Sequence, residues 1–152
     1  MNPDQYPEIK AWAAGYTGNL DYLDFLTRNS TVGQWLAFCR VLWPRFVRER
    51  GCTLWDRAYD PENFEAWYHR LDGDTLRIEA TLNRIVVADV VDTELTPEDD
   101  DALNEIAETI GRAWRAALSQ AYPGEQFEVL VDDTDDGPVV SFAAVAPRET
   151  DE

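Results

Sequence analysis

Thr96–Gly124, TPEDDDALNEIAETIGRAWRAALSQAYPG, predicts a long helix near the end of the chain. Thr96 suits the N-cap position and Pro97 the first helical position. Pro123-Gly124 ends the helix, because proline cannot continue it. Apolar residues recur at three- and four-residue spacing, which marks one buried face. That face comprises Leu103, Ile106, Ala107, Ile110, Trp114, Ala117 and Leu118.

The residues after this helix predict a β-hairpin. Phe127, Val129 and Val131 alternate with residues that face the other way, as expected of a strand with one buried face. A loop over 132–138 leads to a second apolar run over 139–145, VVSFAAV. Upstream, the short run 52–55 is expected to supply a third strand.

The first half of the chain predicts mostly helix. Short helices are expected over residues 7–14, from Asn19, from Ser30 or Thr31, and over 60–71. For the helix that begins near residue 30, the expected apolar face is Val32, Trp35, Leu36, Cys39, Leu42 and Trp43. From Thr75 the spacing favours a helix to about Arg84, followed by irregular or extended chain. Most of the six tryptophans are expected in the core, with Trp43 partly exposed.

Helices first and a hairpin last indicate an α+β fold. We expect a helix-rich N-terminal two-thirds packed on a small antiparallel sheet that includes the C-terminal hairpin. The length of 152 residues suits one domain, expected to span 1–147, with a flexible acidic tail over 148–152. A composition that is 45% hydrophobic argues against intrinsic disorder.

The chain is strongly acidic, with a formal net charge of −17. Residues 89–152 carry −15 of it, whereas residues 28–57 are net +4. Binding to nucleic acid or to an anionic membrane requires cations, so we expect neither. The charge favours a basic protein partner or no electrostatic partner. An alternative is that the acidity is only an adaptation to high salt.

The sequence predicts a cytoplasmic protein without disulfide bonds. The two cysteines, Cys39 and Cys52, form no recognised spacing, and no disulfide is expected. Cys39 lies in a helical apolar pattern, so we expect it to be a buried free thiol. The first residues lack the basic and apolar regions of a signal peptide. No apolar run approaches transmembrane length.

No pattern in the sequence predicts catalysis or a cofactor. His69 is the only histidine, and with Glu65 four residues earlier it is expected on the surface. No serine or cysteine lies in an activation motif, and no nucleotide or zinc spacing is present. We therefore predict no catalytic residue, no metal site and no cofactor.

One segment resembles a calcium-binding loop in part. Asp132–Gly137 fits the loop pattern at its first, fifth and sixth positions, but the twelfth position is Ala143 instead of glutamate. Because strands are expected on both sides, we interpret this segment as a solvated hairpin loop.

The function that the charge favours is that of a non-enzymatic protein-binding module. Acids near a helix start are stabilising within the first turn, which leaves a surplus beyond it. We expect this surplus to face a basic partner, through Asp100, Asp101, Asp132, Asp133, Asp135 and Asp136. Bacterial immunity or inhibitor proteins against basic nucleases follow the same charge logic.

The alternative is a small-molecule-binding domain or a small enzyme. In this hypothesis Arg40 or Arg45 holds an anionic ligand, with Tyr68 or His69 at the rim of the pocket. The arginines would otherwise pair with acids of the same chain, or with a second copy in a homodimer.

Overall fold

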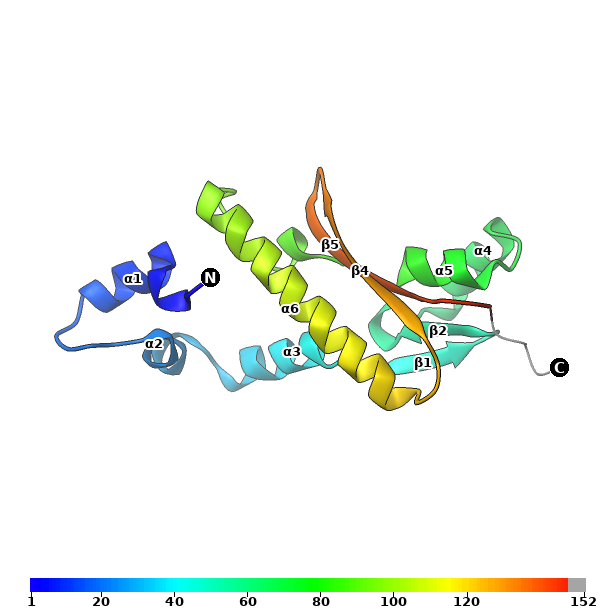
Figure 1. Cartoon of the computed structure of the whole chain (residues 1–152), viewed down its shortest axis with the longest axis horizontal. Helices are drawn as coiled ribbons and strands as arrows, with labels where there is room; N and C mark the ends of the chain where they lie inside the picture. The colour runs from blue at the N-terminus through cyan, green and yellow to red at the C-terminus, as the bar shows by residue number, and fades with distance from the viewer. Residues whose placement is uncertain (148–152) are drawn as a thin grey trace.

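The structure is a computed structural model that describes residues 1–147, so the acidic tail predicted for 148–152 lies outside the described residues. Its central element is helix α6, Pro97–Ala121, which confirms the helix predicted from Thr96 (Figure 1). The Thr96 hydroxyl accepts from the Asp99 N–H, and the Asp99 carboxylate accepts from the Thr96 N–H. This reciprocal capping fixes where α6 begins.

The predicted hairpin is confirmed and belongs to a three-stranded antiparallel sheet. Strands β4, Phe127–Thr134, and β5, Gly137–Ala144, pair along their whole length. The turn between them is shorter than the predicted loop, because the strands continue to Thr134 and Gly137. Gly137 has φ +91°, a conformation that glycine permits.

The third strand of this sheet differs from the one expected. It is β3, Arg84–Val86, which pairs with β5 and gives the order β3-β5-β4. The expectation of a helix from Thr75 to Arg84 is nearly met, because α5 covers Thr75–Leu82. After β3 the chain forms a short 3-10 helix, η3, Val87–Asp89.

The run predicted as a third strand forms a separate two-stranded sheet. Strand β2, Cys52–Trp55, pairs only with β1, Phe46–Glu49, through a turn at Arg50 and Gly51. Both turn residues have positive φ, as this tight type of hairpin turn requires. Every residue of β2 is buried.

Two buried residues join the two sheets: Glu79, which lies in α5, and Asn83, which directly follows it. The carboxylate of Glu79 accepts from Thr53 N–H of β2 at 2.6 Å and from Ala144 N–H of β5 at 2.5 Å. Asn83 likewise accepts from the N–H of Trp55, and its backbone carbonyl accepts from that of Phe142. These side-chain and backbone oxygens accept hydrogen bonds from backbone N–H groups of β2 and β5. Those N–H groups would otherwise be buried without a partner.

Apolar residues form one core on each side of β2. The larger core lies between α6 and the three-stranded sheet and includes Trp55, Trp114 and Phe142. The smaller core lies beneath α5 and helix α4, Pro61–Arg70, and includes Leu54, Phe64 and Ile78. These elements complete an α+β fold, as the sequence predicted.

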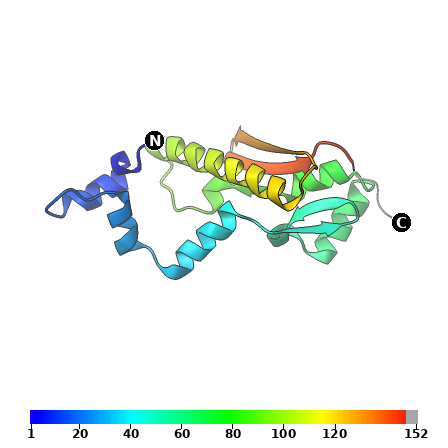
Figure 2. The ribbon, with the colours of Figure 1, turned by 60° about the horizontal axis from the view of Figure 1, so that its bottom comes forward.

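The first 43 residues form an N-terminal arm that extends from this folded part (Figure 2). The arm holds a 3-10 helix η1, Pro3–Gln5, and helices α1, Pro7–Ala14, α2, Tyr22–Asn29, and α3, Val32–Leu42. None of these helices contains a buried residue. Only Trp55 and Trp114 of the six tryptophans are buried, so the expectation that most of them lie in the core is wrong; Trp35 is 46% exposed. Trp43 is exposed, as expected.

Within residues 1–147 no helix combines the length and the apolar composition needed to cross a membrane.

Candidate functional site

Two acidic segments that are far apart in sequence lie at the same end of the fold. Strand β4 runs back along α6, so the β4–β5 turn returns towards the start of that helix (Figure 1). Between them lies η3, where the side chain of Ala88 is close to Gly137. We call residues 89–101 together with 132–136 the acidic end of the molecule.

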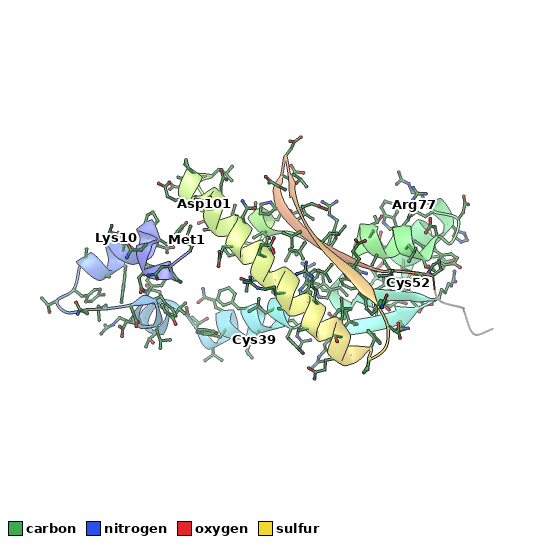
Figure 3. The ribbon with its side chains drawn as sticks, viewed as in Figure 1. Met1, Lys10, Cys39, Cys52, Arg77 and Asp101 are labelled. Atoms are coloured by element: carbon green, nitrogen blue, oxygen red, sulfur yellow. The ribbon has the colours of Figure 1, made fainter. Side chains whose placement is uncertain are left out.

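The acidic end contains all six residues predicted to bind a partner. All six side chains are exposed, and within the described chain none of their carboxylates forms an ion pair. Figure 3 labels one of them, Asp101, in the first turns of α6. The residues are Asp100, Asp101, Asp132, Asp133, Asp135 and Asp136.

The segments that form the acidic end contain no basic residue that could neutralise its charge. Residues 85–111 contain nine acids and residues 116–147 contain six, and neither segment contains a lysine, arginine or histidine. Like charges held together in this way raise the local negative potential. The acidic end can therefore attract a cationic surface.

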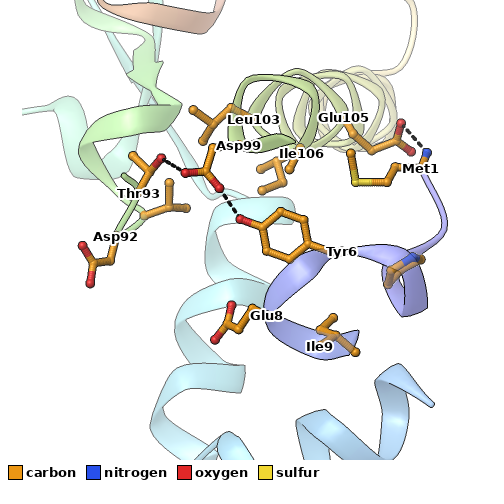
Figure 4. A pocket seen from close by; sticks show the side chains of 13 residues that line it. Met1, Tyr6, Glu8, Ile9, Asp92, Thr93, Asp99, Leu103, Glu105 and Ile106 are labelled. Carbon is orange, nitrogen blue, oxygen red and sulfur yellow. Dashed lines mark hydrogen bonds and ion pairs between the residues drawn. The ribbon is translucent and has the colours of Figure 1, made fainter. Parts of the chain in front are cut away.

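Asp99 belongs to the acidic end but serves the fold instead. Its carboxylate accepts hydrogen bonds from the hydroxyls of Tyr6 and Thr93 and from the backbone N–H of Glu94 (Figure 4). Tyr6, Thr93 and Asp99 border a cavity of about 320 Å³ between α1 and α6. Asp99 thus holds the arm and the loop before α6 in place.

No pattern in the sequence predicted that Tyr6, Thr93 and Asp99 come together. Tyr6 lies 93 residues from Asp99, and Thr93 lies in a segment for which no regular element was predicted. An acid at the third position of a helix is ordinarily interpreted as part of a cap alone.

The hydrogen bond between Tyr6 and Asp99 shifts the pKa of both groups. Donation by Tyr6, then by Thr93, lowers the pKa of Asp99 to about 2. The same bond raises the pKa of Tyr6 to about 12. The contribution of Asp99 to stability is present above pH 3.8 and is lost as the pH falls towards 2. The contribution of Tyr6 is present below pH 10 and is lost as the pH rises through 12.

We expect Tyr6→Phe to move the titration of Asp99 upwards from about 2 towards 3.8, because the largest cause of its lowered pKa is removed. Carbon-13 NMR of the Asp99 carboxyl measures this midpoint directly. Tyr16→Phe is the matched control, since Tyr16 is 46% exposed. A midpoint near 3.8 in the unmodified protein would contradict the arrangement.

The four residues predicted to bind an anionic ligand lie on three separate parts of the chain. Arg40 is in α3 and pairs with Asp56 at 3.7 Å, and Arg45 is exposed in the loop before β1. Tyr68 and His69 are in α4, where His69 pairs with Glu65 at 2.9 Å. In the described chain no hydrogen bond, ion pair or ring contact joins Arg40 or Arg45 to Tyr68 or His69.

The neighbouring arginines are also engaged within the chain. Arg48 contacts both oxygens of Glu125, at 2.7 and 2.8 Å, and stacks over Tyr122. Arg50 pairs with Glu65 and lies over the Tyr68 ring. These contacts use the positive segment 28–57 largely to neutralise acids of the same chain.

In residues 1–147 no group of three or more His, Cys, Asp and Glu side chains is arranged to hold a metal ion. The segment that partly resembles a calcium loop is the end of the β4–β5 hairpin, in which the Thr134 hydroxyl donates to the Gly137 carbonyl. Both cysteines are free. Cys52 is buried, but the expectation of a buried Cys39 is wrong, because that residue is exposed on α3.

No protein-family model, curated protein or solved structure matches this chain.

Proposed function

We propose that this chain is a non-enzymatic protein-binding module that presents its acidic end to a basic partner. The observation that carries the proposal is the juxtaposition of the β4–β5 turn with the start of α6, both acidic and both in segments that contain no lysine, arginine or histidine. A surface with charge of one sign mainly speeds the association of oppositely charged partners, and it disfavours the binding of partners with charge of the same sign. Bacterial immunity and inhibitor proteins against basic nucleases follow this logic.

The state of the ionisable side chains supports binding over catalysis. His69 is exposed and paired with a carboxylate, and Asp99 already accepts several hydrogen bonds. A general base needs a free acceptor within reach of a substrate or a nucleophile.

The distribution of acid supports a functional role over an adaptation to salt. An adaptation needs only a high average charge, whereas here the arm, residues 1–43, has four acids against three bases. Residues 89–152 carry −15 of the net charge of −17, and 11 of their 18 acids lie in the acidic end.

The test is a comparison of two triple variants with the same change in charge. Asp100→Asn, Asp101→Asn and Asp133→Asn neutralise the acidic end, and Glu62→Gln, Asp72→Asn and Glu128→Gln neutralise exposed acids elsewhere. A basic protein captured from the source lysate should associate with the unmodified chain at a rate that falls roughly tenfold between low and 0.5 M salt. The first variant should lose most of that rate, and the control should retain it.

Two outcomes would refute the proposal. One is the failure to capture any protein whose binding responds to salt. The other is an equal loss of rate in both triple variants, which would assign the effect to net charge and not to the acidic end.

A further inference from the structure

Helix α3 carries an uncovered apolar stripe. Val32, Trp35, Leu36 and Cys39 stand three, four and seven residues apart, which places them on one face of the helix. Val32 is 79% exposed, Trp35 46% and Leu36 67%, and Cys39 is also exposed. These are residues that the periodicity predicts to be buried, so the pattern and the exposure disagree within a single chain.

The opposite side of α3 faces α6 across an apolar groove. Ala37, Phe38 and Val41 face α6, where they line an apolar groove with Ile106 and Ile110. The indole N–H of Trp114 donates to the Val41 carbonyl at 2.8 Å and fixes the end of α3 against α6. The helix is therefore held with its stripe directed away from the folded part, and Figure 3 labels Cys39 on it.

The exposed area of the chain is larger than its mass explains. A compact monomer of 17.3 kDa exposes about 7,800 Å², whereas this chain exposes 10032 Å². The difference, about 2,200 Å², belongs to the chain as a whole, and an interface of standard size needs only about 800 Å² from each copy.

A second copy also carries a net charge of −17, so two copies repel each other except where the facing surfaces carry little charge. The arm has a net charge of only −1, and α3 contains no acid. Contact through α3 therefore lets two copies meet while their acidic residues remain apart.

We propose that α3 is a homodimerisation surface, on which the stripes of two copies pack against each other about a two-fold axis. One symmetric contact covers both exposed stripes, which is the closed arrangement that most soluble homo-oligomers adopt. The two α3 helices run antiparallel, so that their dipoles oppose.

The test is sedimentation equilibrium of the full chain from about 1 μM to about 100 μM. The unmodified protein should approach twice 17.3 kDa, and Leu36→Asp should remain at 17.3 kDa throughout. Leu95→Asp is the matched control, because Leu95 is also 67% exposed but lies outside the arm. It should dimerise like the unmodified protein. Circular dichroism verifies that each variant is folded.

Salt separates this proposal from the one for the acidic end. An apolar contact should persist or strengthen in about 1 M salt, whereas binding of a basic partner should weaken. Loss of dimer in salt would contradict α3 packing, and loss of partner binding alone would leave it intact.

A second measurement needs no variant. Cys39 is the exposed thiol of the stripe and Cys52 is buried, so a maleimide should modify Cys39 first. Its rate of modification should fall as protein concentration rises, because the dimer covers it. A mass of 17.3 kDa at every concentration, with a constant Cys39 rate, would overturn the proposal. So would a dimer that Leu36→Asp leaves unchanged.

Discussion

Replacing Glu79 with alanine should lower the free energy of unfolding by about 3–5 kcal/mol. The side chain is fully buried, and its two oxygens accept from the backbone of Thr53 in one sheet and of Ala144 in the other. Alanine leaves both N–H groups without that acceptor in a dry interior, at about 1–3 kcal/mol each. Since domains of this size are stable by about 5–15 kcal/mol, the loss approaches the threshold of folding.

A second substitution at Glu79 tests whether the carboxylate itself is needed or only a side chain of the same volume. Glu79→Gln keeps the volume but turns an NH₂ group towards one of the two backbone donors, so it should still cost about 2–3 kcal/mol. Urea unfolding followed by circular dichroism at 222 nm measures both variants. Glu108→Ala is the control, because Glu108 is an exposed glutamate within a helix and should change stability by less than about 0.5 kcal/mol. A loss below about 1 kcal/mol for Glu79→Ala would contradict its role in joining the sheets.

The burial of Glu79 was not predictable from local sequence. It stands in a short amphipathic helix, where a glutamate is ordinarily assigned to the solvent face. Its partners are backbone amides 26 and 65 residues away, and only the tertiary fold brings them to it. Strand β3 escaped prediction for a related reason, since three residues of strand carry little periodicity and their partner strand begins at Gly137.

Elements with strong local signals were predictable. Helix α6 begins at a threonine cap followed by proline and continues for 25 residues, so local propensity and packing agree. The hairpin followed from alternation, although its turn proved shorter than the loop that Asp132–Pro138 suggested. Both acidic segments were visible in the sequence, but their proximity depends on β4 running back along α6.

Helix α3 shows a different limit of sequence reasoning. Its periodicity predicts an apolar face, and the structure has that face, with Val32 and Leu36 on it. Periodicity reports that a face is apolar, not whether the same chain covers it. The disagreement between pattern and exposure is therefore informative about assembly, and it motivates the homodimer proposed above.

Replacing Trp114 with alanine should lower the free energy of unfolding by about 3–5 kcal/mol. The residue is fully buried in α6, with its ring 5.3 Å from that of Trp55 and 5.7 Å from that of Phe142. The smaller side chain leaves a cavity where three aromatic rings meet, and the sheet and helix around it relax only in part. Trp67→Ala on α4 is the control, since Trp67 is only half-buried, and it should cost clearly less.

Trp114→Phe separates the packing of the ring from the anchoring of α3. Phenylalanine keeps an aromatic ring but cannot donate to the Val41 carbonyl, so the end of α3 loses its hydrogen bond to α6. We expect amide hydrogen exchange of residues 32–42 to accelerate more than that of α5 or β5, together with a weaker dimer. Uniform acceleration across the chain would instead mean that Trp114 stabilises the core alone. In that case the orientation of the α3 stripe must depend on the contacts of Ala37 and Phe38 with α6.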